Sequence, residues 1–196
     1  MNAAFEMLDR SDRELWIVTS KLGERVGGLI ATFVNAGSIA SEAPRVVVGL
    51  AKQHHTWELV EGSGAFALHL IDEAHVDWVW RFGLRSGRDV DKFDGLAWHS
   101  GTSGAPLLDE SLGWLDCRVE SRMDTGDRTI YLAEVVAAHS RDSTPPLTVQ
   151  RMLQSATPEQ RSELKRQRLA DSRIDAERIR AWRSSQAGTQ NTPSPP

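Results

Sequence analysis

The residues best suited to chemistry lie in one stretch, residues 27–64, where two extended apolar runs are joined by a small polar segment, NAGS at 35–38. Small residues allow a flat ligand to approach the backbone closely. A polar run, KQHHT at 52–56, then leads into a predicted short helix. Lys52, Thr56 and the free N–H groups of the first helical turn can together bind a phosphate. The stretch therefore predicts a site for a flat ligand with an anionic end.

The two adjacent histidines of this stretch, His54 and His55, do not predict a metal site. No cysteine or carboxylate stands at a metal-ligand spacing from them. His55 is either a donor to the phosphate or an exposed residue at the start of the helix. The sequence also contains no GxGxxG or Walker motif and no recognisable acid–base dyad or triad.

The composition is that of an ordinary globular protein. The 196 residues are enough for about one domain plus an appendage. A net charge of −4 argues against broad nucleic-acid binding. No apolar run approaches the ~20 residues that span a bilayer, and the first residues resemble neither a secretory signal nor a transit peptide, so we expect a cytoplasmic protein. The single cysteine, Cys117, excludes a disulfide within the chain and is expected to be a small buried strand residue.

The predicted strands favour a barrel. Residues 112–122 and 128–139 flank DTGD at 124–127, a turn sequence, and predict an antiparallel hairpin. The continuously apolar run at 45–50 predicts a strand covered on both faces. Further strands are predicted at 15–20, 25–34 and 65–71, with short extended pieces around 96–98 and 106–108. Because most connections are short turns and helices are few, a small β-barrel is favoured over a parallel α/β sheet.

Two short helices and a charged loop accompany these strands. The first helix, at 55–61, is expected to be capped by His55 or Thr56 and to end at Gly62. The second is predicted at 73–82 from its apolar spacing. The loop at 83–91 is interpreted as solvated, with binding of nucleotide phosphates as the alternative; the basic residues around it are Arg81, Arg85, Arg88 and Lys92. Four tryptophans are expected in the core or an interface rather than stacked on a ligand: Trp57, Trp78, Trp80 and Trp98.

The composition changes after Ser140. A capping box with proline at the first helical position, TPEQ at 157–160, predicts a helix from Pro158 to about residue 169. The apolar residues beyond it recur every five residues, which would leave one long helix without an apolar face. We therefore expect a break near Ser172, a second short helix, and a disordered tail from Ser184. The predicted parts are a barrel domain at 1–140, a helical extension at 141–183 and the tail at 184–196.

Residues 15–138 resemble the flavin reductase-like, FMN-binding split-barrel family. The resemblance lies in the order and spacing of many short pieces, none of them specific alone. These are TFVNAGS at 32–38, EAP at 42–44, VVVGL at 46–50, KQHHTWEL at 52–59, GAFALHL at 64–70, RF at 81–82, DKF at 91–93, GAPLL at 104–108, WLDCRV at 114–119, and GD at 126–127 with IYLAEV at 130–135. The resemblance implies a mainly β split barrel, here with a C-terminal helical extension.

The resemblance also implies a homodimer that holds FMN near the subunit interface and receives a hydride from NAD(P)H. The hydride chemistry belongs to the cofactors, so a catalytic triad is not required. The residues that match the family's flavin-ring segment are Thr32, Phe33, Val34, Asn35 and Ser38. The residues that match its phosphate side are Lys52, His55 and Thr56.

Two positions depart from the family pattern. The common Gly-Asp-His reads Gly126-Asp127-Arg128, and an arginine cannot donate a proton near neutral pH. Arg128 can instead bind a nucleotide phosphate or stabilise reduced flavin, or it can be a solvated hairpin residue. His69 stands where the family often has asparagine; it is interpreted as a hydrogen-bonded packing residue, with contact to the cofactor as the alternative.

The resemblance implies an NAD(P)H-dependent flavin reductase, with Arg128 as the candidate residue at the reacting end. Electrons would pass from bound FMN to a second flavin, a partner oxygenase or another acceptor. The alternative is a non-catalytic FMN carrier or electron-transfer protein. No metal, nucleic acid or membrane is expected to take part.

Overall fold

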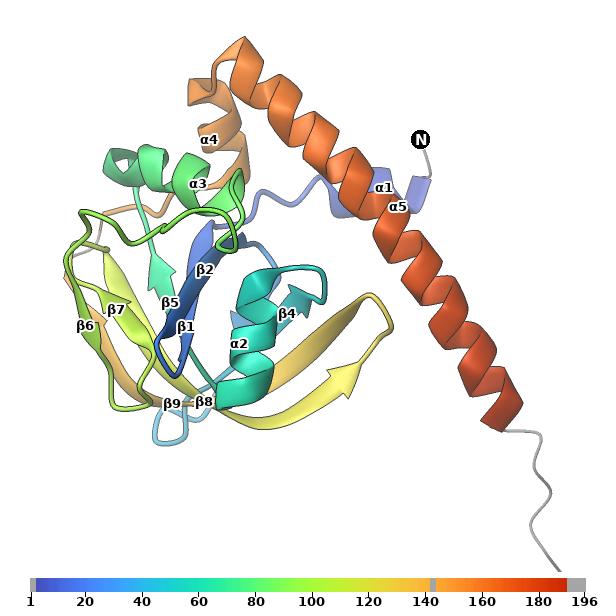
Figure 1. The fold of residues 1–196 in the computed structure, drawn as a ribbon. Coiled ribbons are helices and arrows are strands. Elements are labelled where there is room, and N and C mark those ends of the chain that lie inside the picture. Colours follow the sequence, from blue (N-terminus) through green and yellow to red (C-terminus); the bar gives the residue numbers. More distant parts are fainter. Residues whose placement is uncertain (1–2, 142–143, 190–196) are drawn as a thin grey trace, which may run out of the picture.

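A curled antiparallel sheet of seven strands forms the body of the protein (Figure 1). The computed structural model describes residues 3–141 and 144–189. The strand order is β2-β1-β5-β8-β9-β4-β3. The strands are β1 (Trp16–Leu22), β2 (Arg25–Ala31), β3 (Val34–Ala36), β4 (Arg45–Ala51), β5 (Ala65–Leu70), β8 (Gly113–Asp124) and β9 (Arg128–Ser140). The predicted fold, a mainly β barrel, is confirmed.

The sheet curls because consecutive strands lie at its opposite edges. β2 and β3 occupy the two ends of the strand order, yet only Thr32 and Phe33 separate them in the chain. The predicted strand at 25–34 therefore ends earlier, at Ala31, and Phe33 accepts a hydrogen bond from the Gly49 N–H of β4 at 2.9 Å. The two edges are held close together at this join, which is where the predicted flavin-ring segment begins.

Two apolar clusters fill the two sides of the sheet. The first, inside the curl, includes Val18, Val48, Phe66 and Tyr131. Cys117 belongs to it, as expected from the sequence, and burial raises the pKa of its thiol to about 12. The second cluster lies under α3 (Val76–Gly83) and includes the side chains of Ile17, Phe82, Phe93, Leu108 and Leu147. A small second sheet pairs β6 (Trp98–Ser100) with β7 (Pro106–Leu108).

Helix α2 (His55–Ser63) packs on β1 and β2 and differs from the prediction at both ends. Its N-cap is His54, whose side chain makes no capping hydrogen bond, so neither His55 nor Thr56 is the cap. Its end is set by Gly64, which adopts φ 66°, and not by Gly62. Gly62 instead allows close packing, since a Cβ there would lie 2.4 Å from Leu22 Cδ2.

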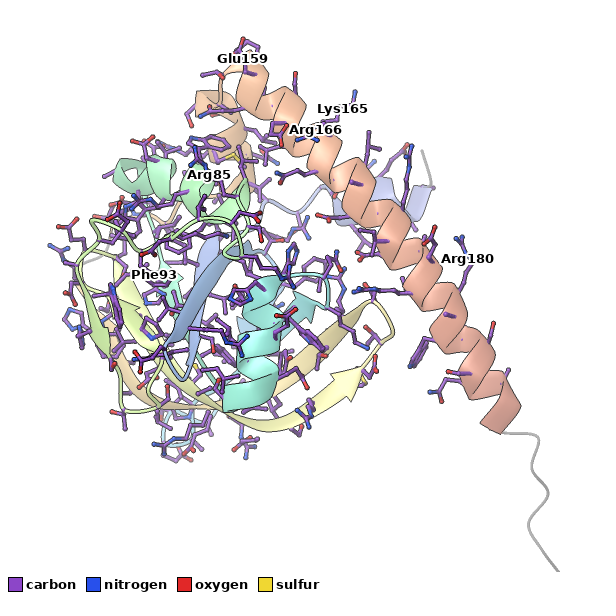
Figure 2. All side chains as sticks on the ribbon, viewed as in Figure 1. Arg85, Phe93, Glu159, Lys165, Arg166 and Arg180 are labelled. Carbon is purple, nitrogen blue, oxygen red and sulfur yellow. The ribbon has the colours of Figure 1, made fainter. Side chains whose placement is uncertain are left out.

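The C-terminal region is one long helix, α5 (Pro158–Thr189), and not two short ones. The expected break near Ser172 was wrong because α5 contacts the barrel mainly through polar side chains and needs no continuous apolar stripe. Ser184 to Thr189 also belong to α5, whereas the remainder of the predicted tail, 190–196, lies outside the described residues. Charged side chains, Lys165 and Arg180 among them, extend from α5 on the side away from the barrel (Figure 2).

The other helices are short. They are α1 (Ala3–Leu8), the 3₁₀ turn η1 (Glu73–His75) and α4 (Val149–Ser155). Within residues 3–141 and 144–189, no helix combines the length and the apolar character needed to cross a membrane.

Candidate functional site

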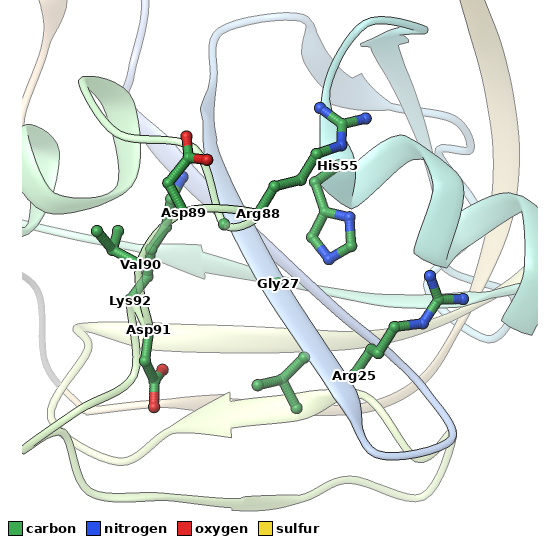
Figure 3. Close-up of a pocket in the computed structure, with 10 residues that line it drawn as sticks. Arg25, Gly27, His55, Arg88, Asp89, Val90, Asp91 and Lys92 are labelled. Atoms are coloured by element: carbon green, nitrogen blue, oxygen red, sulfur yellow. The ribbon is translucent and has the colours of Figure 1, made fainter.

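A cavity of about 530 Å³ lies between the start of β2, the N-terminus of α2 and the loop at 83–92 (Figure 3). The nitrogen-bearing ends of Arg25, His55 and Arg88 lie on one side of the cavity, and the carboxylates of Asp89 and Asp91 lie on the other, together with Lys92. The backbone N–H groups at the start of α2 add positive potential on the side of His55, because no side chain caps that end. The basic side of the cavity is therefore suited to a phosphate.

Two glycines let the walls of this cavity approach each other. A Cβ on Gly27 of β2 would lie 2.7 Å from Leu59 Cδ1 and 3.3 Å from His55 Cδ2. A Cβ on Gly87 of the loop would lie 3.3 Å from the same His55 atom. The His55 ring is thus held between strand and loop at positions where a larger residue would crowd it.

Lys92 fixes the loop to the barrel. Its ammonium donates to the carbonyl oxygens of Gly28 at 2.9 Å and Phe82 at 2.8 Å, so it joins the loop to β2 and α3. Only 5% of the residue is exposed, and this burial lowers the pKa of Lys92 to about 8. The interpretation of this segment as a solvated loop was therefore wrong for Lys92.

Arg88 is held beside the N-terminus of α2 by two contacts. Its guanidinium pairs with Glu58 at 2.5 Å and donates to the Gln53 carbonyl oxygen at 3.2 Å. The hydrogen bond from Arg88 is the main cause of a lowered pKa at Glu58. Glu58 also lies 3.3 Å from His55 Nδ1. The Glu58 carboxylate thus orients His55 and Arg88, two of the three basic residues on this side of the cavity, and offsets part of their positive charge.

The structure separates the three residues predicted for the phosphate side. His55 lines the cavity. Thr56 is buried, 2% exposed, and its hydroxyl faces β2 near Gly27. The Lys52 ammonium lies 2.7 Å from Asp124 at the tip of the β8–β9 hairpin and is not among the residues that line the cavity.

The predicted flavin-ring segment surrounds Phe33, which is 49% exposed. The Arg128 guanidinium lies over the Phe33 ring, 4.6 Å from its centroid. Along the same segment, Asn35 pairs with Val47 of β4, and the Ser38 hydroxyl accepts a hydrogen bond from the Ala40 N–H at 3.0 Å. Thr32 and Val34 are partly buried on either side of Phe33. The fold therefore brings Arg128 and the segment at 32–38 together.

Arg128 is anchored by two carboxylates and is not a solvated hairpin residue. Its side chain is only 19% exposed. Nε donates to Asp127 at 2.6 Å, and Nη2 donates to Asp175 of α5 at 2.9 Å. A residue of the C-terminal helix thus takes part in the candidate site.

His69 has the packing role expected from the sequence. It is fully buried, with Nδ1 3.1 Å from the Ile17 carbonyl oxygen and Nε2 accepting from the Leu108 N–H at 3.0 Å. Burial lowers the pKa of His69 to about 4. The tryptophans also have packing roles: Trp57 donates to the Thr129 hydroxyl at 2.9 Å, and three others pack on the second apolar cluster, namely Trp78, Trp80 and Trp98.

Sequence reasoning did not find Arg25 or the glycines that frame His55. Arg25 follows a tight turn and carries no motif, and its place in the cavity depends on the loop at 83–92 folding back onto β2. The basic residues of that loop were noted, but the burial of Lys92 could not be read from local charge. The sequence signal for a functional loop was its glycine, Gly87, which lines the cavity beside His55.

Comparison with known proteins places this chain in a family. The family profile described as "Flavin reductase like domain" matches residues 8–156. The chain is 31% identical over 136 residues to a ferric-chelate reductase (NAD(P)H) of Archaeoglobus fulgidus, covering 68% of this chain and 79% of the relative. It is 30% identical over 136 residues to a high molecular weight rubredoxin of Moorella thermoacetica, covering 68% of this chain but only 58% of that relative.

A solved structure agrees with this assignment. Nitrilotriacetate monooxygenase component B from Mycobacterium thermoresistibile superimposes with a TM-score of 0.66 at 25% identity, covering 78% of this chain and 87% of the other. The chain belongs to the flavin reductase-like family, whose members have the FMN-binding split-barrel fold. Helix α5 begins at Pro158 and lies outside the matched residues.

Proposed function

We propose that this protein is an NAD(P)H-dependent flavin reductase that binds FMN and passes electrons to a flavin or protein acceptor. Family membership supports a flavin-linked oxidoreductase. The observation that carries the more specific proposal is the basic side of the cavity, which is lined by Arg25, Arg88 and His55, the first residue of the uncapped helix α2. This arrangement is suited to the phosphate that distinguishes FMN from riboflavin.

The donors present fit FMN at both ends. The phosphate would bind among Arg25, His55, Arg88 and the first N–H groups of α2. Lys52 and Thr56, predicted for this role, would belong to an outer layer, since Lys52 is paired with Asp124 and Thr56 is buried. The flavin ring would meet the segment at 32–38, where short polar side chains and open backbone flank Phe33.

The cofactor, when bound, supplies the hydride-accepting chemistry. The chain's own residues then need to bind, orient and limit solvent access. Arg128 remains protonated at neutral pH, so it acts through charge and not as a proton donor. Glu58 keeps Arg88 and His55 oriented toward the phosphate end. The absence of histidine at position 128 is therefore compatible with hydride transfer between two bound cofactors.

The names of the relatives support the donor and the acceptor class. One relative is named a reductase that uses NAD(P)H, and one structural neighbour is named a monooxygenase component. We extend both to this chain: NAD(P)H as the donor and an oxygenase among the possible acceptors. Assembly as a homodimer and a cytoplasmic location belong to the same proposal and rest on the family resemblance and on the sequence.

A second candidate function is a non-catalytic FMN carrier. It is favoured by one observation, the pairing of Arg128 with both Asp127 and Asp175, which leaves little positive charge for a nicotinamide nucleotide. Anaerobic mixing of the FMN-loaded protein with NADH or NADPH, followed at the visible flavin band, separates the two functions. Rapid bleaching supports the reductase, and a band that persists supports the carrier. A protein that fails to bind added FMN refutes both.

A further inference from the structure

Helix α5 lies outside the residues matched by the family but contacts the candidate site through a small polar network. Asp175 Oδ2 accepts from Arg128 at 2.9 Å, and Asp175 Oδ1 accepts from the Gln53 side chain at 3.2 Å. Arg178 donates to the other end of the Gln53 amide, also at 3.2 Å. Gln53 adjoins the α2 N-terminus, so α5 bridges the phosphate side and the Arg128 side of the site.

The turn between β8 and β9 fits directly beneath α5. Gly126 adopts φ 92°, and a Cβ there would lie 2.6 Å from Trp182 Cβ and 3.0 Å from the Arg178 carbonyl oxygen. The helix therefore rests on the Gly126-Asp127-Arg128 turn itself. This turn contains Arg128, one of the two positions where the sequence departs from the family pattern.

The contacts that hold α5 against the barrel are mostly polar. Gln167 donates to the Leu84 carbonyl oxygen at 3.1 Å, and Arg168 pairs with Asp9 at 2.7 Å. The helix places Leu164 against the second apolar cluster near its start. Each polar contact exchanges for a contact with water, so its net contribution is a fraction of its strength in isolation. Between the apolar contacts made by Leu164 and Trp182, α5 is held by polar side chains, so this part separates from the barrel at a lower cost than a helix packed by apolar side chains throughout.

The charges around Arg128 depend on whether α5 is in place. With α5 docked, two carboxylates surround one guanidinium. Asp127 belongs to the same turn and is 5% exposed, so it stays with Arg128. Asp175 leaves if α5 moves, which frees Nη2 and removes one negative charge. Release of α5 would therefore make the surroundings of Arg128 less repulsive to an incoming phosphate.

We propose that α5 is a releasable latch on the candidate site, in which Asp175 occupies the anion-binding edge of Arg128 until a phosphate-bearing nucleotide displaces it. This inference rests on the proposed function in one respect, that the displacing ligand is the nicotinamide nucleotide. Binding of that nucleotide and release of α5 are then coupled, because both compete for the same nitrogen atom. The helix limits access to the site until the substrate is present.

The test compares the full-length protein with Asp175→Asn, which removes the charge and keeps the size of the side chain. ADP, the moiety shared by NADH and NADPH, is the probe because it binds without being oxidised. We expect Asp175→Asn to bind ADP about fivefold more tightly at low salt, an effect between those of exposed and buried ion pairs. Hydrogen exchange of the amides at 171–182 should be faster in this variant, and ADP should accelerate it in the wild type.

Glu177→Gln is the matched control, since it removes one charge from an exposed position of the same helix. It should leave both ADP affinity and exchange unchanged. Arg178→Ala removes the Gln53 contact together with one positive charge, so it should speed exchange at 171–182 without tightening ADP binding. Both predictions for Asp175→Asn require that the variant is folded. An unchanged far-ultraviolet circular dichroism spectrum establishes this.

Unchanged or weaker ADP binding by Asp175→Asn overturns the latch, as does exchange at 171–182 that does not respond to ADP. Neither readout requires flavin or turnover. A protein that releases α5 on binding ADP but is not bleached by NADH or NADPH would retain the latch and refute the reductase. A protein whose flavin is bleached by NADH or NADPH but whose exchange at 171–182 does not respond to ADP would support the reductase and refute the latch.

Discussion

Gly27→Ala tests whether the close approach of β2 and α2 shapes the cavity. The new Cβ would lie 2.7 Å from Leu59 Cδ1, and Leu59 is fully buried, so its side chain has no space to swing aside. The strand backbone or the first turns of α2 must move instead. Overpacking of this kind costs about 1–3 kcal/mol. Because His55 Cδ2 lies only 3.3 Å from the same position, displacement of α2 also moves the phosphate donors.

Urea unfolding of the flavin-free protein measures the first effect, as a lower midpoint with an unchanged slope. Fluorescence titration with FMN measures the second, with an expected loss of affinity of about fivefold or more. Gly83→Ala is the control: its Cβ would make an ordinary contact, 3.4 Å from Ile30 Cγ1, and should change stability by no more than about 0.5 kcal/mol. Wild-type stability together with wild-type FMN affinity in Gly27→Ala would refute the reasoning.

The remaining predictions concern charge. Arg88→Ala should weaken FMN about fivefold more than riboflavin, because only FMN carries the phosphate; equal losses would place the phosphate elsewhere. Lys52→Ala should affect both flavins equally, since Lys52 pairs with Asp124 and, unlike Arg88, does not line the cavity; a selective loss of FMN would show that Lys52 turns into the site. His69 has a pKa of about 4 in the folded protein against an ordinary value of 6.5, so the unfolded chain takes up its proton first as the pH falls. This residue should therefore cost the fold about 3 kcal/mol between pH 6.5 and 4; His69→Asn should reduce that loss of stability in urea titrations at several pH values, and an identical pH dependence would contradict the assignment.

The parts of the fold governed by local sequence were predictable. Turn residues at 124–127 located the β8–β9 hairpin, and the continuous apolar run at 45–50 located β4. The ordered series of short motifs identified the family and its barrel. These signals come from neighbouring residues in the chain, so each can be recognised without knowing which distant segments pack against them.

The features that sequence reasoning missed depend on contacts between distant segments. Lys92 is buried because carbonyl oxygens of β2 and α3 accept its protons, and no charge pattern in the loop reveals those acceptors. Helix α5 is continuous because it docks through polar side chains, so the search for an apolar stripe led to a false break near Ser172. The ion pair of Lys52 was also out of reach of sequence reasoning, because its partner, Asp124, lies 72 residues further along the chain.

The central claim is that the cavity between β2, α2 and the loop at 83–92 holds the phosphate of FMN. The most direct measurement is the ratio of dissociation constants for riboflavin and FMN, determined by fluorescence titration of the same flavin-free protein at low salt. We predict that FMN binds at least about tenfold more tightly than riboflavin and that the preference falls as salt is added. Equal affinities for the two flavins would contradict the claim.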